Sequence, residues 1–226
     1  MLLDLSCCSL RAINSLGEMH MNYNFFGIPV YETNMESFDA ISTEMINRVT
    51  PLFETDDDIA HESQRGGSKS VYYKCNFRLH NTVDISPITD FILEHAKIYW
   101  GQLNYSKHLT PQILNTWANI TPPGGNWDSH MHSPAPIAGA FYLNASPDMG
   151  NLVFEHPLET LLACQPYDFD EKPKHFDSIV EAKTGKLVLF PGWLKHKTQI
   201  NNSDQTRLVI GINIGCHGTV NYIHLI

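Results

Sequence analysis

Two closely spaced histidines are the first residues in this chain with an evident chemical use. His130 and His132 lie in the segment NWDSHMH, residues 126–132, which is predicted to be a strand. Side chains two residues apart on a strand share a face, so both imidazoles can bind one ion. Asp128 shares that face if the strand extends back to it. Because the chain has twelve histidines, such a pair also arises by chance, and it needs support from elsewhere.

That support comes from two segments near the carboxyl end. FPGWLKH, residues 190–196, leads into a predicted strand that begins at His196. The next predicted strand, TRLVIGINI at 206–214, alternates: Leu208, Ile210, Ile212 and Ile214 face one way, and Arg207, Val209, Gly211 and Asn213 face the other. A buried arginine without a partner is costly, so the second face is predicted to line a pocket that binds an anion.

Short strands with turn residues between them must position these side chains. Eight such runs are visible, at residues 113–120, 126–132, 138–144, 151–155, 178–183, 186–190, 196–200 and 206–214. They favour an all-β sandwich or barrel. The first half predicts two flanking helices, one capped by Asn34 and running to about residue 50, the other with Ser86 as its N-cap and Pro87 at its first helical position. Residues 70–77 are predicted to be a strand, and residues 156–177 a long functional loop.

One chemistry accounts for these groups together. Non-haem Fe(II) oxygenases hold iron with three ligands on one side and leave the other coordination positions open. A 2-oxo acid and O2 then occupy those positions. The remote carboxylate of 2-oxoglutarate needs a cation that binds in a bidentate manner, which arginine provides better than lysine. His130, His132 and His196 are therefore candidate iron ligands, and Arg207 is the candidate anchor of the cosubstrate.

From about residue 113 to 214 the chain resembles the double-stranded β-helix core of the 2-oxoglutarate/Fe(II) oxygenase superfamily. It is most similar to an oxygenase family of marine bacteria and phages, which has an H-x-H motif. The matching positions are Trp117–Asn119, His130–His132, Gly139–Phe141–Tyr142, Gly150–Leu152, Gly185–His196 and Arg207–Asn213. In the prolyl-hydroxylase-like members, a P-G-G segment precedes the first ligand, as Pro123–Gly124–Gly125 precedes His130 here. The resemblance implies a fold that is mainly β with flanking helices, around a jelly-roll or cupin-like core.

His132 departs from the pattern of the superfamily. The common triad is His, Asp or Glu, His, and His132 stands at the carboxylate position. Three metal sites remain open: one with three histidines, one with two histidines and water, and one with a carboxylate from Asp128 or Glu155. A site without a carboxylate could in principle transfer halide, but His132 disfavours that outcome because a histidine can still bind the metal.

Several other residues receive roles by their positions relative to these motifs. Tyr142, Asn119, Thr198 and Asn213 are candidate contacts of the cosubstrate, and Trp117 and Trp127 of the substrate. Each also has an ordinary structural explanation. Trp117 is typical of a protein core, a buried Tyr142 needs only a hydrogen-bond partner, and Asn213 can satisfy backbone groups near a strand end.

The length and composition of the chain limit its possible domain organisation, partners and compartment. The chain has 226 residues, 42% hydrophobic and 17% charged, which suits one globular domain. We assign residues 1–20 to an N-terminal extension, for which disorder is an open alternative. Residues 21–226 form the single oxygenase domain, with supporting elements at 21–110 and the core at 111–215. A net charge of −9 disfavours nucleic-acid partners, no apolar run is long enough to span a membrane, and five irregularly spaced cysteines favour the cytoplasm.

The sequence thus predicts a dioxygenase that uses Fe(II), 2-oxoglutarate and O2 to hydroxylate a C–H bond, releasing succinate and CO2. The expected substrate is a peptide side chain or a small metabolite, and the oligomeric state is not readable. Two alternatives use the same barrel: a cupin-like metal enzyme that does not need 2-oxoglutarate, and a non-catalytic binding module. A structural zinc site is a weaker alternative, because closed zinc sites usually contain thiolates and no cysteine lies near these histidines.

Overall fold

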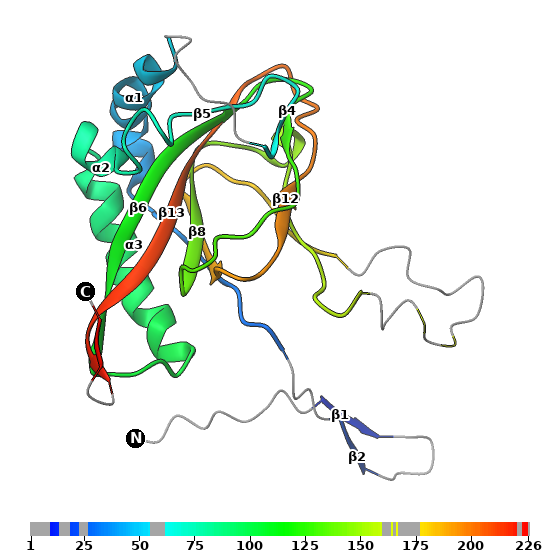
Figure 1. Cartoon of the computed structure of the whole chain (residues 1–226). Coiled ribbons are helices and arrows are strands. Elements are labelled where there is room, and N and C mark those ends of the chain that lie inside the picture. The colour runs from blue at the N-terminus through cyan, green and yellow to red at the C-terminus, as the bar shows by residue number, and fades with distance from the viewer. Residues whose placement is uncertain are drawn as a thin grey trace.

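Long strands with one apolar face build the larger of two opposed β-sheets (Figure 1). The computed structural model describes residues 10–13, 19–22, 27–54, 62–159, 164, 166, 177–220 and 223–225. The larger sheet is antiparallel and has the order β3-β11-β8-β13-β6-β5, with β14 paired to β13. Its strands are β3 (Tyr31–Asn34), β5 (Lys69–Ser70), β6 (Leu109–Thr121), β8 (Ile137–Asn144), β11 (Lys186–Pro191), β13 (Arg207–Val220) and β14 (Ile223–Leu225).

The smaller sheet has three strands and faces the inner side of the larger one. Its order is β10-β9-β12, with β9 at Leu152–Phe154, β10 at Ser178–Val180 and β12 at His196–Thr198. A short pair, β4 (Gln64–Arg65) with β7 (Asn126–Trp127), lies next to β12. The two opposed sheets are the double-stranded β-helix that the sequence predicts. All eight predicted strand segments contain a strand, although β7 ends at Trp127, five residues before the predicted end.

Helices cover the outer face of the larger sheet. They are α1 (Phe38–Val49), α2 (Leu79–Thr82) and α3 (Ser86–Gln102), with 3₁₀ turns η1 (Thr50–Phe53) and η2 (Pro147–Met149). Figure 1 shows α1 and α3 against β6 and β13. Ile88, Ile92 and Tyr99 of α3 are fully buried against Ile210 and Ile212 of β13 and their neighbours. The apolar face of β13 therefore faces the helices, and its other face is left for the space between the sheets.

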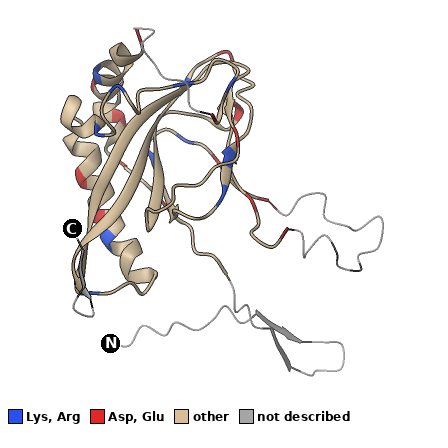
Figure 2. Cartoon of the chain, in the orientation of Figure 1, with Lys and Arg blue, Asp and Glu red and all other residues tan. Residues whose placement is uncertain are grey.

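Charge follows the same division. Figure 2 shows acidic and basic residues on the helices and loops, whereas the long strands carry almost none. Among β6, β8 and β13, the only Lys, Arg, Asp or Glu residue is Arg207. Because burying a charge is costly, a single cation among apolar strands indicates that this residue has a specific function.

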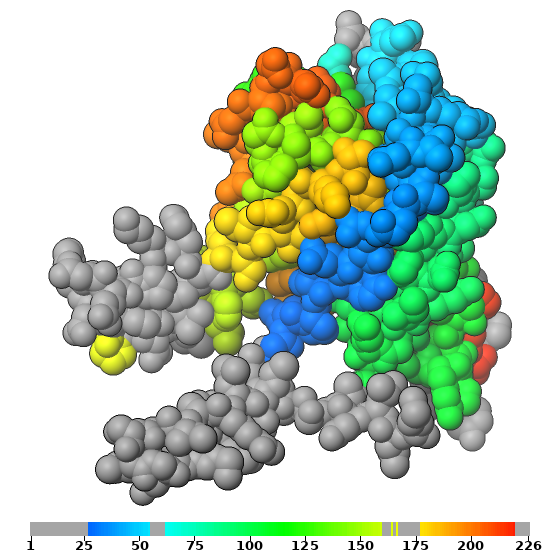
Figure 3. All heavy atoms as spheres, turned by 180° about the vertical axis from the view of Figure 1, so that it is seen from behind, coloured from blue at the N-terminus to red at the C-terminus, as the bar shows by residue number. Residues whose placement is uncertain are grey.

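The N-terminal part of the domain departs from prediction at the start of the first helix. Asn34 does not cap it: this residue ends β3 and pairs with Lys186 of β11, and the N-cap is Ser37, three residues later, so that α1 begins at Phe38. Figure 3 shows the segment that starts at residue 27 beside the segment that contains β11. Pairing with a sheet edge therefore prevails over the capping tendency of asparagine.

Residues 70–77 are the second departure. The strand ends at Ser70, and residues 72–77 form turns in which Asn76 and Phe77 have φ of +47° and +63°. Tyr72 packs on Phe77, with ring centroids 4.6 Å apart, and edge-on against Trp117 at 5.0 Å. This aromatic cluster folds the segment back on itself, so the strand prediction was wrong there.

Three further predictions concern the N-terminal extension, the long loop and membrane-spanning segments. A hairpin of β1 (Leu10–Ile13) and β2 (Met19–Asn22) overlaps the range assigned to the N-terminal extension, and the rest of residues 1–26 lies outside the described part. Of the predicted loop at 156–177, the structure describes only residues 156–159, 164, 166 and 177. None of the described helices has the length and apolarity that a bilayer crossing requires.

Candidate active site

A cavity of about 460 Å³ lies between the two sheets, lined on one side by β6, β8 and β13. The register of β6 and β13 gives four cross-strand pairs on this side: Arg207 with Thr121, Val209 with Asn119, Gly211 with Trp117, and Asn213 with Asn115. Of these residues, all but Asn115 line the cavity. Pairs in such a row are about 7 Å apart. We number them one to four from Arg207, and this order gives each residue a position along the cavity.

The three predicted histidines converge on this cavity. His196 begins β12, and its backbone exchanges two hydrogen bonds of 3.0 Å with the backbone of His130. The backbone N–H of His132 donates to the carbonyl of Gly192 at 2.8 Å. As a result, one ring nitrogen from each histidine lies within 4.8 Å of the other two, and the His132 and His196 Nε2 atoms are 3.2 Å apart. His130 and His132 do not share a regular strand, so backbone bonds to the segment 192–196 bring the rings together.

Backbone carbonyls fix two of the rings in the form that a metal needs. His130 Nδ1 lies 2.7 Å from the carbonyl of Asp128, and His196 Nδ1 lies 3.0 Å from the carbonyl of Leu194. A carbonyl only accepts hydrogen bonds, so Nδ1 carries a proton, and in a neutral ring Nε2 then keeps its lone pair. Burial, followed by the nearby His130 and His132, holds the pKa of His196 well below its ordinary value. The ring is therefore neutral, as a metal ligand must be.

The two carboxylates considered as alternative ligands are bound elsewhere. Asp128 forms an ion pair of 2.6 Å with Arg65 on the outside of the site. Glu155 accepts a hydrogen bond from Ser129 at 2.7 Å and pairs with Lys197 at 3.3 Å. Within the described ranges, the cluster of possible metal ligands contains the three histidines and neither carboxylate.

Arg207 lies at the first pair, 2% exposed. Its Nη1 donates to the carbonyls of Met149 and Gly150, and its Nη2 donates to Thr121 Oγ1 at 3.1 Å. Nε is buried without a hydrogen-bond partner, and no carboxylate in the part of the chain described here forms an ion pair with this guanidinium. Burial lowers the pKa of Arg207. A buried cation without an anionic partner fits a site for a carboxylate ligand.

Other predicted contacts of the cosubstrate lie at the same end of the cavity. Tyr142 is opposite Val209 at the second pair, and burial raises its pKa to about 12 although the nearby Arg207 acts in the other direction. Asn119 is also at the second pair, where its amide can accept from Trp117 Nε1 at 3.2 Å and donate to Ser70 at 2.7 Å. Thr198 lines the cavity and accepts a hydrogen bond of 2.9 Å from the backbone of Trp127.

The two tryptophans assigned to the substrate are mostly buried, at 7% and 6% exposure. Trp127 Nε1 donates to Thr121 Oγ1 at 3.0 Å, so Trp127 lies at the Arg207 end. The Trp117 ring packs on Gly211, where an added Cβ would lie 2.3 Å from the indole, and it stacks on His132 with centroids 5.5 Å apart. This arrangement makes Trp117 a positioning residue for His132.

Sequence reasoning did not single out Thr121 or Phe190. Thr121 accepts hydrogen bonds from both Arg207 and Trp127, and Phe190 packs edge-on against His196 at 4.6 Å. The alternation of Trp117, Asn119 and Thr121 in β6 was a signal for the first. Phe190 lies in the apolar run KLVLF, which does not alternate between polar and apolar residues. The sequence therefore does not indicate which face of this strand meets the histidines.

Residues 115–213 match a protein-family model described as "Putative 2OG-Fe(II) oxygenase". Solved structures share the fold. The epimerase SnoN, in complex with Fe³⁺, α-ketoglutarate and nogalamycin RO, has a TM-score of 0.60 at 10% identity, over 87% of this chain and 83% of that one. HygX from Streptomyces hygroscopicus, with nickel, 2-oxoglutarate and hygromycin B bound, has 0.53 at 11%, over 83% of each chain.

A Pseudomonas putida prolyl-4-hydroxylase has a TM-score of 0.52 at 12% identity, over 83% of this chain and 92% of that one. No curated protein sequence matches this chain significantly. The matched residues 115–213 contain all three histidines and the Arg207 end of the cavity. Over these residues, which make up less than half of the chain, the sequence matches the model of a 2-oxoglutarate- and Fe(II)-dependent oxygenase family, and the solved structures share the fold.

Proposed function

We propose that this protein is a 2-oxoglutarate- and Fe(II)-dependent oxygenase that hydroxylates a C–H bond of a peptide side chain or a small metabolite. In this proposal His130, His132 and His196 hold the iron, and Arg207 anchors 2-oxoglutarate. One observation carries the proposal. Three imidazoles and a buried guanidinium without an anionic partner line the same cavity. When bound, iron and 2-oxoglutarate supply the oxidation of the C–H bond by O2, with succinate and CO2 as the co-products.

The residues present fit both groups. Three imidazoles on one side of the cavity form a donor set that suits Fe(II), and the carbonyls of Asp128 and Leu194 orient two of them. The unpaired Nε of Arg207 can donate to a carboxylate. Tyr142 has a raised pKa, so its hydroxyl stays protonated at neutral pH and is able to donate to the same ligand.

The walls of the cavity supply the remaining requirements of the reaction. Phe190 packs against His196, and Trp117 packs against His132, so water is excluded from one side of each ring. A dry, rigid surround keeps the ligand geometry fixed and limits side reactions. The reaction needs no general base from the protein. The cavity has only to bind the metal and cosubstrate, orient the substrate and exclude water.

The substrate class is supported by the size of the cavity and by what related folds bind. A volume of about 460 Å³ is within the usual range for small-molecule pockets. The solved relatives include HygX, with hygromycin B bound, and a prolyl-4-hydroxylase. Both a small metabolite and a peptide side chain are therefore compatible with the fold.

The test is anaerobic addition of Fe(II) and then 2-oxoglutarate to metal-free protein, followed by visible spectroscopy. A charge-transfer band is expected in the wild type, weakened in His132→Ala and retained in His132→Asp. A band that His132→Ala leaves unchanged would contradict the three-histidine site. Bound Fe(II) without a band would indicate the cupin-like enzyme, and no metal binding would indicate a non-catalytic module.

A further inference from the structure

Asn213 lies at the opposite end of the cavity wall from Arg207. Both residues face the cavity from β13, at the first and the fourth cross-strand pairs, and the register with β6 is unbroken between them. Six residue steps of a strand cover about 20 Å. The Arg207 guanidinium stays at its own end because it donates to Thr121, its partner in the first pair.

A bound 2-oxoglutarate cannot reach both residues. An extended five-carbon diacid spans roughly 7 Å, since each carbon–carbon bond is about 1.5 Å. Held by Arg207, it covers the second pair, where Tyr142 and Asn119 lie. Asn213, which sequence reasoning grouped with these cosubstrate contacts, is therefore too far away to join them.

The histidine cluster lies between the two ends. His132 stacks on Trp117, and Trp117 packs on Gly211 in the third pair. The order along the wall is thus Arg207, then the Tyr142 and Asn119 level, then the histidines, then Asn213. The fourth pair lies beyond the histidines, on the side that remains for a substrate.

Asn213 also has an unused acceptor. Its Nδ2 is 3.4 Å from Asn115 Oδ1, a long contact, while its Oδ1 is buried with no hydrogen-bond partner. Tyr72 and Trp117 line the same cavity, and their rings pack edge-on at 5.0 Å. A buried acceptor beside an aromatic wall suits a ligand that brings a donor and has an apolar body.

We infer that Asn213 determines substrate specificity: its amide oxygen accepts a hydrogen bond from an N–H or O–H group of the substrate, close to the C–H bond that is oxidised. The inference rests on the proposed function for the identity of the reaction. The substrate class narrows to molecules with a hydrogen-bond donor next to a compact apolar group, such as an amide N–H beside an aliphatic carbon.

The first test measures the affinity for 2-oxoglutarate, in the presence of metal, of variants at the Arg207 end and at the Asn213 end of the cavity. Asn213→Leu is expected to leave the Kd of 2-oxoglutarate within about twofold of wild type, whereas Arg207→Ala raises it roughly tenfold or more. An equal loss in the two variants would place Asn213 at the cosubstrate end and overturn the inference. No binding of 2-oxoglutarate by the wild type would instead refute the proposed function.

The second test uses metal-free protein and two probes, 2-pyrrolidinone, which has an N–H donor, and N-methyl-2-pyrrolidinone, which has none. NMR titration of the wild type is expected to give roughly five- to tenfold tighter binding of the first probe. Asn213→Leu is expected to abolish this preference. Asn213→Asp, which keeps an acceptor oxygen, and Asn202→Leu, at an exposed loop position, are expected to retain it. The absence of a preference in the wild type, including failure of both probes to bind, would overturn the inference.

Discussion

In the proposed function, the guanidinium of Arg207 is the group that binds the remote carboxylate of 2-oxoglutarate. Arg207→Lys keeps a positive charge but loses the planar fork and the unpaired Nε. We expect the Kd of 2-oxoglutarate to rise roughly tenfold, because a lysine cannot contact Thr121 and a carboxylate with the same geometry. Isothermal titration with metal-loaded protein measures this change, and an unchanged Kd would show that the charge alone is sufficient.

A second prediction concerns the source of the third metal ligand. Asp128→Asn and Glu155→Gln are expected to leave Fe(II) affinity unchanged within about twofold, because Arg65 and Lys197 already bind these carboxylates. His132→Ala is expected to weaken Fe(II) binding by roughly tenfold or more, as loss of a ligand group does. Equilibrium dialysis under anaerobic conditions compares the three variants. A loss in either carboxylate variant that matched His132→Ala would favour a mixed site.

Single residues also show how far sequence reasoning extends. Arg207 was predictable because it interrupts an apolar strand on the face opposite Ile210 and Ile212. The ion pair between Asp128 and Arg65 was not, because it joins segments 63 residues apart through a contact that no local pattern encodes. The position of Asn213 relative to Arg207 follows from strand geometry, but its unused acceptor becomes visible only with the packing of Asn115.

At the scale of elements, the contact between β6 and β13 carries the histidine site. Gly211→Ala would place a Cβ 2.3 Å from the Trp117 ring, and that ring supports His132. We expect Fe(II) affinity to fall by more than about fivefold and the free energy of unfolding to drop by about 1–3 kcal/mol, as overpacking costs.

A glycine elsewhere provides the matched control for this substitution. An added Cβ at Gly101, in α3, meets nothing within 4 Å. Gly101→Ala is therefore expected to raise stability by up to about 1 kcal/mol, from helix propensity, without changing metal affinity. Denaturant unfolding and metal titration of both variants make the comparison. Intact Fe(II) binding in a destabilised Gly211→Ala protein would show that Trp117 does not position His132.

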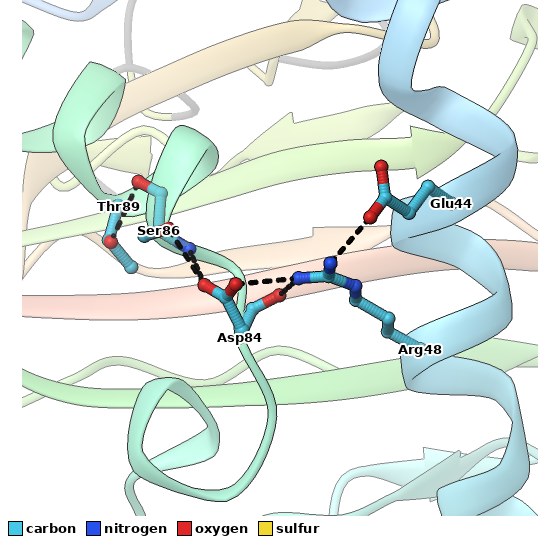
Figure 4. Close-up of polar contacts among 5 residues, drawn as sticks. All are labelled: Glu44, Arg48, Asp84, Ser86 and Thr89. Carbon is cyan, nitrogen blue, oxygen red and sulfur yellow. Dashed lines mark hydrogen bonds and ion pairs between the residues drawn. The ribbon is translucent and has the colours of Figure 1, made fainter.

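The start of α3 gives a prediction about acid stability (Figure 4). Asp84 Oδ1 accepts from the Ser86 backbone at 3.1 Å and from its hydroxyl at 2.7 Å, and Arg48 of α1 pairs with the same carboxylate at 2.8 Å. The Ser86 hydroxyl and backbone, with Arg48, lower the pKa of Asp84 from 3.8 to about 2. A depressed pKa means that the charged form stabilises the fold above the ordinary value and that this contribution disappears as the pH falls to about 2.

Asp84→Ala should therefore have a lower Tm than wild type at pH 7, and the difference should shrink between pH 4 and pH 2. Asp204→Asn, at an exposed loop position, provides the control, with an expected Tm close to wild type throughout. Thermal unfolding across this pH range is the measurement. A difference that stayed constant with pH would show that the Asp84 contacts contribute through packing rather than charge.

The same element shows what sequence could and could not predict about local structure. The sequence predicted Ser86 as the N-cap of α3 and Pro87 as its first residue, because both are typical of a helix start. The helix instead begins at Ser86 itself, with Ile85 as its N-cap, so the prediction was wrong by one residue. Ile85 makes no capping hydrogen bond with its side chain, and the backbone N–H and hydroxyl of Ser86 both donate to Asp84, two residues earlier. For α1, the competing pairing of Asn34 with β11 depends on a strand more than 150 residues away. The capping tendency of asparagine alone therefore cannot predict that Asn34 pairs with a strand so distant in sequence.

At the scale of the whole molecule, the proposed function has metal and cosubstrate bind between the two sheets. Arg207 belongs to the larger sheet, His196 to the smaller one, and His130 and His132 to the segment between β7 and β8. Ligands that bind across such a space stabilise the folded chain because they do not bind the unfolded one. At a hundredfold excess over Kd, the gain is about 2.7 kcal/mol, and for a chain of this length that raises Tm by roughly 5–10 °C.

We therefore expect Mn(II), used in place of the oxidisable Fe(II), to raise the Tm of the wild type, and 2-oxoglutarate to raise it further only when metal is present. Arg207→Ala should respond to metal but lose the increment from 2-oxoglutarate, whereas His196→Ala should lose both, since without metal the 2-oxo acid keeps only its Arg207 contact. Differential scanning calorimetry with each ligand alone and with both together separates these cases. An increment from 2-oxoglutarate that did not depend on metal would mean that the diacid binds at Arg207 without reaching the histidines, and the cavity would then hold two independent sites.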